Sequence, residues 1–442
     1  MTKKNTGKKK KSTVRHTRAI QRDRSKRPNI APPDAKIEQR LTEFLEPAIK
    51  AQKPQCKKLK LRARILTLSV MVAIVVSLIW RQIGSGGTEI SRLLKLEGLL
   101  WVSRIIVSQQ AISERLRVFP SELFLNILTH ILPQLHQRWC TRQRPLPQIL
   151  AWAQERYTAV LAVDGSTLDA LLRKVGLLRE SKTFPLAGKM MAILDLCSWL
   201  PTHLWYNQDA KAHDQRFWPE ILNAIPKGAL LLFDLGFTNF AMFKQLAHCT
   251  FVTRAKVNLS FQVRCVKQWT PNVRDMLGWI GSGETRQSIR LVKIRYHGVW
   301  RNYLTNELNP FHLSAEYIAA LYLQRWRIED AFNIAKRLLG LAYFWTGSQQ
   351  GVQLQMWATW ILYAILVDLT DDIAEALNRP FTDISMEMVY RSLYHFAQAY
   401  RRGEADDLIA YLVSNADTLG IVKQYRPQPT GKLFDLTNHS GP

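Results

Sequence analysis

Cysteine is scarce in this sequence, and the cysteines that do occur form no recognisable pattern. Five are scattered through 442 residues, with no CxxC pair and no histidine at metal-ligand spacing: Cys56, Cys140, Cys197, Cys249 and Cys265. A secreted domain built on disulfides needs more cysteines than this, and a zinc site needs them closer together. We therefore expect reduced thiols in a cytoplasmic protein.

Uninterrupted apolar sequence is also limited. The segment 65–80 has 16 residues without a charge, between Arg64 and Arg81, whereas a membrane-spanning helix needs roughly 20. Both flanks are basic, so no positive-inside asymmetry orients the segment. We expect a buried helix and no membrane partner; a membrane anchor at 65–80 is the alternative. No apolar stretch follows the lysines near the N-terminus, which argues against a signal peptide.

Acidic side chains are outnumbered, and this imbalance is the most informative feature of the composition. There are 61 Lys and Arg against 35 Asp and Glu, which gives a net charge of +26. Such a charge predicts attraction to polyanions, above all to nucleic acid. The first 30 residues hold 12 Lys and Arg and a single acid. Residues 1–35 are therefore predicted to be a disordered basic tail that contacts DNA without sequence preference.

The remaining sequence is long enough for two or three domains. Apolar residues recur at three- and four-residue spacing in 37–49, 59–83, 90–112 and 120–131, which predicts a helical N-terminal domain over 36–145. Thr88 is expected to cap one of these helices. Arg138, Arg142 and Arg144, followed by prolines, suggest a linker to the next domain.

Beyond residue 150 the pattern is typical of a mixed α/β fold. Apolar strand-like runs end at Asp164 and at Asp234, a hairpin is expected within 189–206, and helices are expected near 214–224 and 240–247. Residues 257–312 are predicted to be β-rich, with a basic face and a bulge in the strand at 289–296. Helical patterns resume at 314 and continue to about 412, before a loose tail.

Asp164 and Asp234 occupy equivalent places in this pattern. Each ends an apolar strand and is followed by a glycine within two residues. A carboxylate at the end of a rigid strand is well placed to hold a hard metal ion. An Asp-Gly pair after a strand is also a common turn, so position alone does not decide between the two interpretations.

A helix predicted near 318–340 carries a third carboxylate. At 3.6 residues per turn, Tyr322, Arg325, Glu329 and Lys336 lie within about 60° of one another, beside an apolar stripe that includes Ile328. A solvated face with an ordinary ion pair between Arg325 and Glu329 is the alternative interpretation.

These four residues resemble a family signature. Their spacing is that of the Y-(2)-R-(3)-E-(6)-K motif of the IS4 family of bacterial insertion-sequence transposases, and the resemblance extends over about residues 60–375. The segments around Asp164 and Asp234 also resemble the family's motifs, with Leu235 in place of an arginine.

The resemblance implies an RNase H-like catalytic core formed by residues 150–256 and 313–376. The 94 residues between Asp234 and Glu329 would include a β-rich insertion at 257–312. The helical domain at 36–145 would bind transposon ends, and helices and a tail would occupy 377–442. Asp164, Asp234 and Glu329 would bind two Mg²⁺ ions, with Mn²⁺ as a substitute.

The same resemblance assigns DNA-contacting roles and partners. Tyr322, Arg325 and Lys336 would bind phosphates of the transposon end. Trp300 would stack on an extruded base, although a core tryptophan is the simpler interpretation. The predicted function is hydrolysis at the terminal inverted repeats followed by joining of the 3′-OH to target DNA, in a homodimer that pairs two ends. A nuclease without strand transfer and an inactive DNA-binding relative are the alternatives.

Overall fold

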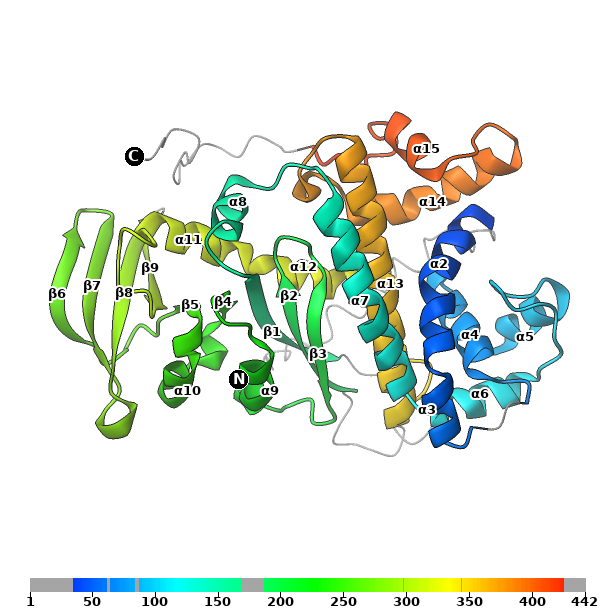
Figure 1. Cartoon of the computed structure of the whole chain (residues 1–442), viewed down its shortest axis with the longest axis horizontal. Coiled ribbons are helices and arrows are strands. Elements are labelled where there is room, and N and C mark those ends of the chain that lie inside the picture. The colour runs from blue at the N-terminus through cyan, green and yellow to red at the C-terminus, as the bar shows by residue number, and fades with distance from the viewer. Residues whose placement is uncertain are drawn as a thin grey trace, which may run out of the picture.

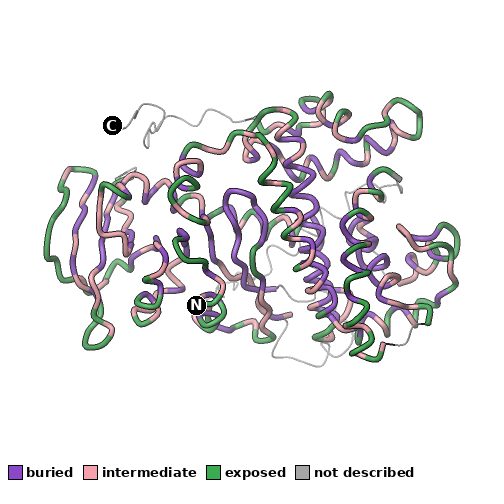
Figure 2. The backbone as a smooth tube through the Cα atoms, viewed as in Figure 1, coloured by how far each residue is buried: buried purple, intermediate pink, exposed green. Residues whose placement is uncertain are grey.

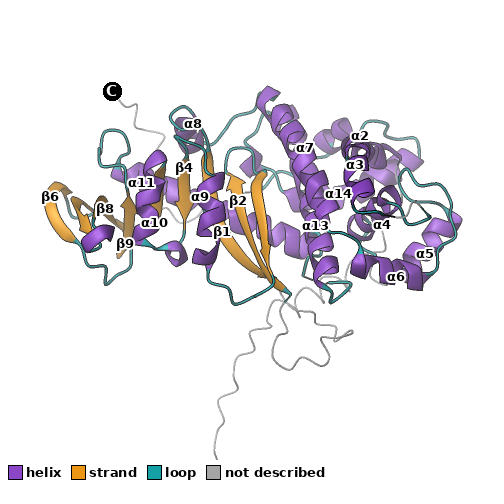
Figure 3. Ribbon diagram, turned by 60° about the horizontal axis from the view of Figure 1, so that its bottom comes forward, coloured by secondary structure: helices purple, strands orange, loops and turns teal. Residues whose placement is uncertain are grey.

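The computed structural model describes residues 35–61, 64–83, 87–168, 187–296, 298–342 and 344–424. Helices gather at one end of an elongated molecule, and a sheet extends through the other (Figure 1; Figure 3, strands in orange). The tails predicted at the two ends of the chain lie almost entirely outside the described residues.

A nine-stranded sheet has the order β3-β2-β1-β4-β5-β9-β8-β7-β6. Its strands are β1 (Val160–Leu168), β2 (Gly188–Asp195), β3 (Pro201–Asn207), β4 (Leu230–Phe233), β5 (Thr250–Arg254), β6 (Gln262–Trp269), β7 (Val273–Ile280), β8 (Gln287–Tyr296) and β9 (Val299–Thr305). Strands β1, β2 and β3 pair antiparallel, whereas β4 and β5 run parallel to β1. The predicted mixed α/β fold and the hairpin within 189–206 are confirmed.

Strands β6 to β9 continue the same sheet, because β9 pairs with β5. The predicted bulge in the strand at 289–296 is wrong. The pairing of β8 is regular on both sides, and the register shifts occur between β6 and β7. The expected basic face is also only partly correct: Arg290 is fully buried and forms an ion pair with Asp275 at 2.6 Å, whereas Lys293 and Arg295 lie on the opposite face.

Helices dominate the N-terminal part of the chain, as expected. They are α2 (Ala35–Ala51), α3 (Lys53–Lys58), α4 (Leu68–Trp80), α5 (Gly87–Leu96), α6 (Gln109–Val118) and α7 (Glu122–Thr141). The helix expected over 90–112 is instead two helices, because the chain turns at Gly98 with a φ of +87°. A Cβ at Gly98 would lie 2.6 Å from the carbonyl oxygen of Val102. Thr88 lies inside α5 and does not cap it.

The segment expected to be a linker is packed into the structure. Arg138 belongs to α7, and Arg142 and Arg144 are buried against α13 (Gln349–Ala376). Arg142 forms ion pairs with Asp368 at 2.6 Å and Asp371 at 3.0 Å. Unpaired charges are too costly to bury, so these contacts tie the N-terminal helices to α13.

Helix α13 is the central helix of the molecule. Among the described residues it is the one helix long and apolar enough to cross a membrane, and 94% of its apolar window is buried by the rest of the chain (Figure 2). Helix α4, which contains most of the segment 65–80, is likewise buried over most of its length. Both are packed as core helices, as predicted for 65–80.

The remaining helices cover the sheet and extend from α13. They are α8 (Gln148–Gln154), α9 (Trp218–Ala224), α10 (Phe240–Gln245), α11 (Ala315–Gln324), α12 (Trp326–Asn333), α14 (Met386–Arg401) and α15 (Leu408–Ser414), and a π-helical turn (Ile334–Leu338) follows α12. Successive residues of a strand point to opposite faces. Accordingly, Val160 and Ala162 join the core on the α12 and α13 side, and Leu161 and Val163 join the core on the α9 and α10 side.

Candidate active site

Strand register brings Asp164 and Asp234 to the same place. Strands β1 and β4 pair in parallel register up to Val163 and Phe233, so the next residues along the two strands are the two aspartates. Ala162 and Leu232, two residues earlier, lie in the core on the α12 side. Because side chains alternate along a strand, both aspartates point to the face that α12 covers.

The predicted helix over 318–340 is present in three parts. Helix α11 ends at Gln324, α12 begins at Trp326, and the turn at Ile334–Leu338 is π-helical. The apolar residues Ile328, Ala331 and Ala335 are fully buried and hold the helix against the sheet. In the π turn, Lys336 reaches β1, where its Nζ donates to the carbonyl oxygen of Thr167 at 2.5 Å.

Tyr322, Arg325 and Glu329 meet the two aspartates. The Tyr322 hydroxyl donates to Asp234 Oδ1 at 2.9 Å. One Arg325 nitrogen, Nη1, lies 2.7 Å from Asp164 Oδ2, and Nη2 lies 3.2 Å from Glu329 Oε1. The structure therefore brings all three predicted carboxylates to one centre, joined by the tyrosine and the arginine of the helix.

The ion pair of Arg325 and Glu329 exists, but it is not on a solvated face. The Arg325 side chain is 4% exposed and Glu329 is 39% exposed. Burial by itself would lower the pKa of Arg325, but Tyr322 and the surrounding carboxylates raise it overall. A buried guanidinium that bridges two acids across secondary-structure elements is a site feature rather than an incidental surface pair.

The Asp164 carboxyl and the Tyr322 hydroxyl both have pKa values above their ordinary ones. Burial raises the pKa of Asp164 to about 6; the guanidinium of Arg325 opposes this shift, and the charges of Glu329 and Asp214 add to it. Burial also raises the pKa of Tyr322. Tyr322 therefore remains a hydrogen-bond donor at neutral pH.

The donor set has the right chemistry for a hard divalent cation. Asp164, Asp234 and Glu329 provide carboxylate oxygens, which suit Mg²⁺ and Mn²⁺. Within the described residues, however, no three His, Cys, Asp or Glu side chains are close enough to hold one ion together. Arg325 lies between Asp164 and Glu329 and supplies the positive charge at that point.

Arg254 is a residue of this centre that the sequence did not reveal. Strands β4 and β5 pair up to Phe233 and Thr253, so Arg254 follows beside Asp234. Its charge acts on Tyr322 and Tyr303, and its Nε is buried without a hydrogen-bond partner. An arginine after an apolar strand is uninformative in sequence; only the parallel register places it here.

Trp300 lies in β9, in the part of the sheet that strands β6 to β9 form, away from the carboxylates. It is partly exposed, and the Arg274 guanidinium lies 4.6 Å from its ring and 4.5 Å from the ring of Trp269. Trp300 is therefore not a buried core residue, which was the simpler interpretation. Among the contacts of the described residues, none joins Trp300 to the three carboxylates.

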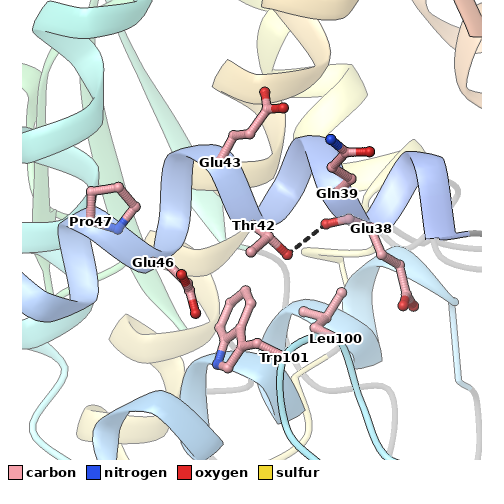
Figure 4. Close-up of a pocket in the computed structure, with 8 residues that line it drawn as sticks. All are labelled: Glu38, Gln39, Thr42, Glu43, Glu46, Pro47, Leu100 and Trp101. Carbon is pink, nitrogen blue, oxygen red and sulfur yellow. Dashed lines mark hydrogen bonds between the residues drawn. The ribbon is translucent and has the colours of Figure 1, made fainter.

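A surface hollow of about 490 Å³ lies on α2 in the N-terminal helical part (Figure 4). Its lining includes Glu38, Glu43 and Glu46, with Leu100 and Trp101 at the opposite side. Glu38 pairs with Arg81 at 2.9 Å and Glu46 with Lys50 at 3.3 Å, so the hollow is only weakly acidic. The described residues that line it offer no basic side chain to a nucleic-acid backbone.

Comparison with known proteins agrees with the site. Residues 159–365 match the family profile described as "Transposase DDE domain". A Sinorhizobium fredii protein named as a transposase, y4zB, is 29% identical over 200 residues, covering 41% of this chain and 54% of that protein. A Geobacillus stearothermophilus protein, named as the transposase for insertion sequence element IS5377, is 31% identical over 108 residues, covering 21% of this chain and 29% of that protein.

A solved structure of a piggyBac transposase synaptic complex with hairpin DNA aligns with 88% of this chain and 84% of that chain, at a TM-score of 0.40 and 12% identity. The chain spans about half the length of the first curated relative and less than a third of the second. The matched residues 159–365 contain all three carboxylates. The chain is thus similar to insertion-sequence transposases in its core; membership of the IS4 family remains a prediction.

Proposed function

We propose that this chain is a DNA transposase of an insertion sequence, with Asp164, Asp234 and Glu329 as its catalytic carboxylates. The observation that supports this most strongly is the convergence of these residues, from β1, β4 and α12, on one face of the sheet. The order β3-β2-β1-β4-β5, with β4 and β5 parallel to β1, supports an RNase H-like core at 150–256 and 313–376. Strands β6 to β9 would then be its β-rich insertion.

The proposed reaction needs no covalent enzyme intermediate. Water would first hydrolyse a phosphodiester at the 3′ end of the transposon, and the freed 3′-OH would then displace an oxygen of a target phosphodiester in line. Two Mg²⁺ ions, or Mn²⁺ in their place, would activate the attacking oxygen and stabilise the leaving one. Asp164, Asp234 and Glu329 would hold them and orient the phosphate between them.

Arg325 is proposed to change partners when DNA binds. A guanidinium pairs as well with a phosphate as with a carboxylate, and an arriving backbone phosphate would draw Arg325 away from Asp164 and Glu329. Both carboxylates would then be available as ligands. Tyr322 and Arg254 lie at this centre, and Lys336 contacts β1 at Thr167, three residues beyond Asp164. All three would provide further hydrogen bonds to phosphate.

The proposed partners are the terminal inverted repeats and target DNA, bound by a cytoplasmic homodimer that pairs two ends. The helical part at 36–145 would bind the ends through a face other than the hollow on α2. Trp300 would stack on a base, which its partial exposure beside Arg274 and Trp269 permits. Helices α14 and α15 would complete the C-terminal part at 377–442.

The test is an assay with purified protein, Mg²⁺ and a plasmid that carries the DNA found on both sides of the gene. We expect cleavage at inverted repeats and the appearance of products in which the freed 3′ ends are joined to strands of a second plasmid. Cut ends that never join would support a nuclease instead. Full DNA binding without cleavage would support an inactive relative.

A further inference from the structure

A fourth carboxylate, Asp214, lies beside two glycines next to the catalytic aspartates: Gly165, inside strand β1, which continues past Asp164 to Leu168 instead of ending there, and Gly236, in the turn that follows Asp234. Asp214 begins a short 3-10 helix (Asp214–Phe217) that leads into α9. A Cβ placed on Gly165, next to Asp164, would lie 2.4 Å from Asp214 Oδ1. A Cβ placed on Gly236, two residues after Asp234, would lie 3.1 Å from Asp214 Oδ2. Each oxygen of Asp214 thus approaches one of the two glycines.

This approach accounts for Gly165 more than for Gly236. Neither Gly165 nor Gly236 has a positive φ in the structure, so neither is needed for an unusual backbone conformation. Atoms closer than 3.0 Å to a Cβ must move, and Asp214 Oδ1 lies well within that limit at Gly165. At Gly165 a Cβ would also lie 2.9 Å from Lys189 Cε, so Asp214 and its lysine together fill the space beside this glycine, whereas at Gly236 a shift of a few tenths of an ångström would relieve the contact.

Asp214 is held in this place from two sides. Lys189 of β2 lies 2.5 Å from Asp214 Oδ1 through its Nζ, which also donates to the carbonyl oxygen of Ala212 at 2.8 Å. The next residue, Gln215, donates through Nε2 to the carbonyl oxygens of Thr238 at 2.9 Å and Gly236 at 3.4 Å. The segment 214–215 therefore connects the strand next to β1 with the turn that follows Asp234.

We infer that Asp214, anchored by Lys189, is a positioning residue that sets the separation between strand β1 at Asp164 and the turn that follows Asp234, and thereby the affinity of the site for divalent cations. The inference rests on the proposed function, because it assumes that the two aspartates are ligands. Residues that orient metal ligands typically change metal affinity or activity by about 10- to 100-fold when replaced. A pair that only stabilised the fold would change the melting temperature and leave the affinity of the folded protein unaltered.

The experiment measures Mn²⁺ binding by electron paramagnetic resonance, using the full chain with a duplex oligonucleotide. Asp214→Asn keeps the shape of the side chain and removes its charge. We expect it to weaken Mn²⁺ binding by at least about tenfold, with a melting temperature close to that of the unaltered protein. Asp209→Asn is the matched control, because Asp209 is an exposed aspartate of the same loop and contacts neither glycine; it should bind Mn²⁺ normally.

Lys189→Met is a second variant, which retains most of the aliphatic stem and releases Asp214. It should weaken Mn²⁺ binding in the same direction, which keeps the inference testable if Asp214→Asn folds poorly. In cleavage assays, the metal concentration for half-maximal rate should rise for both variants, while the rate at saturating Mn²⁺ recovers most of the unaltered value. An equal fall in rate at every metal concentration would contradict a positioning role.

Coupling between Gly165 and Asp214 provides an independent readout. Gly165→Ala should weaken Mn²⁺ binding because the new Cβ displaces the carboxylate. In an Asp214→Ala background the same substitution should weaken binding less, since the closest obstructing atom is gone and the remaining contacts, with Lys189 Cε at 2.9 Å and Met191 Cε at 3.0 Å, are with flexible side chains. Additive effects would overturn the inference. If the unaltered protein neither binds Mn²⁺ nor cleaves DNA, the proposed function itself fails; if it does both and Asp214→Asn matches it, only the positioning role fails.

Discussion

At the scale of single residues, the Arg325 side chain links helix α12 to strand β1. It bridges Asp164 and Glu329 and is almost fully buried. The sequence predicted that it would contact phosphates, whereas the structure places it on the acids. An exchange of partners by Arg325 would reconcile the two roles and would make metal binding dependent on DNA.

This exchange predicts a coupling that can be measured. Duplex DNA should tighten Mn²⁺ binding to the unaltered protein by roughly 5- to 150-fold, the usual range for coupled sites. Arg325→Gln frees both carboxylates without DNA, so the effect of DNA on Mn²⁺ affinity should largely disappear. Arg391→Gln, at an exposed arginine paired with Glu387, should retain the coupling. Equal coupling in all three proteins would contradict the exchange.

Asp164 predicts a dependence of stability on pH. Burial raises its pKa from 3.8 to about 6, so the folded protein holds this proton more tightly than the unfolded chain. Its contribution to stability is therefore greatest below 3.8 and is lost as the pH rises through 6. Asp164→Asn cannot ionise, so the fall in melting temperature between about pH 5 and pH 7 should be smaller than in the unaltered protein, measured in EDTA. An identical fall in both proteins would contradict this account, and Asp209→Asn serves as the control.

Some residues of the site could be predicted from the sequence and others could not, and the difference is whether a local spacing or the tertiary packing brings them to the site. Tyr322, Arg325, Glu329 and Lys336 lie close together in the sequence at the spacing of a known motif. A linear motif is therefore enough to find them. Arg254 and Asp214 reach the site only through the register of β4 with β5 and through the packing of a loop on two glycines. Neither relation leaves a local pattern in the sequence.

At the scale of secondary-structure elements, periodicity predicted which helices exist but not where they end. The expected helix at 90–112 is interrupted because Gly98 adopts a positive φ that most residues avoid. The arginines at 138–144 suggested a linker, because no acidic residues lie near them in the sequence. In the structure Arg138 pairs with Asp368, 230 residues away, and Arg142 pairs with Asp371, 229 residues away. Long-range charge pairing is the part that local reasoning misses.

The ion-pair network on α13 predicts an unequal effect of two similar substitutions. Asp368 is 1% exposed in its side chain and pairs with Arg40 and Arg142, each at 2.6 Å. Asp368→Ala removes the most buried carboxylate of this network, although Arg40 keeps Asp372 and Arg142 keeps Asp371; it should lower the free energy of unfolding by about 3 kcal/mol, the lower end of the cost of breaking a buried pair. Glu387→Ala removes an exposed pair and should change it by less than about 1 kcal/mol. Denaturant unfolding followed by tryptophan fluorescence compares them; similar effects would contradict the network's role.

At the scale of the whole molecule, charge is distributed unevenly. The hollow on α2 is weakly acidic, whereas the outer face of strands β7 to β9 presents Arg274, Lys293 and Arg295 beside Trp300. The register of these strands places the basic residues on one face. A net charge of +26 predicted a polyanion as partner, but it did not indicate which surfaces would meet it.

The uneven charge predicts which surface contributes to the salt dependence of DNA binding. The double variant Lys293→Gln and Arg295→Gln should weaken duplex binding and reduce the slope of log K against log salt by about 2, roughly one for each phosphate that the variant no longer neutralises. Glu43→Gln with Glu46→Gln, in the hollow on α2, should leave the slope unchanged. Fluorescence anisotropy at several salt concentrations measures both, and an unchanged slope in the first variant would exclude this face from DNA binding.

The most direct test of the central claim is cleavage of the flanking-DNA plasmid by Glu329→Gln in Mg²⁺. This substitution keeps the size of the side chain and removes the charge of the third carboxylate. The proposed site predicts a fall in cleavage rate of at least about a thousandfold, with duplex binding retained and with Glu387→Gln fully active. Cleavage by Glu329→Gln at the rate of the unaltered protein would contradict the assignment of Asp164, Asp234 and Glu329 as one catalytic set.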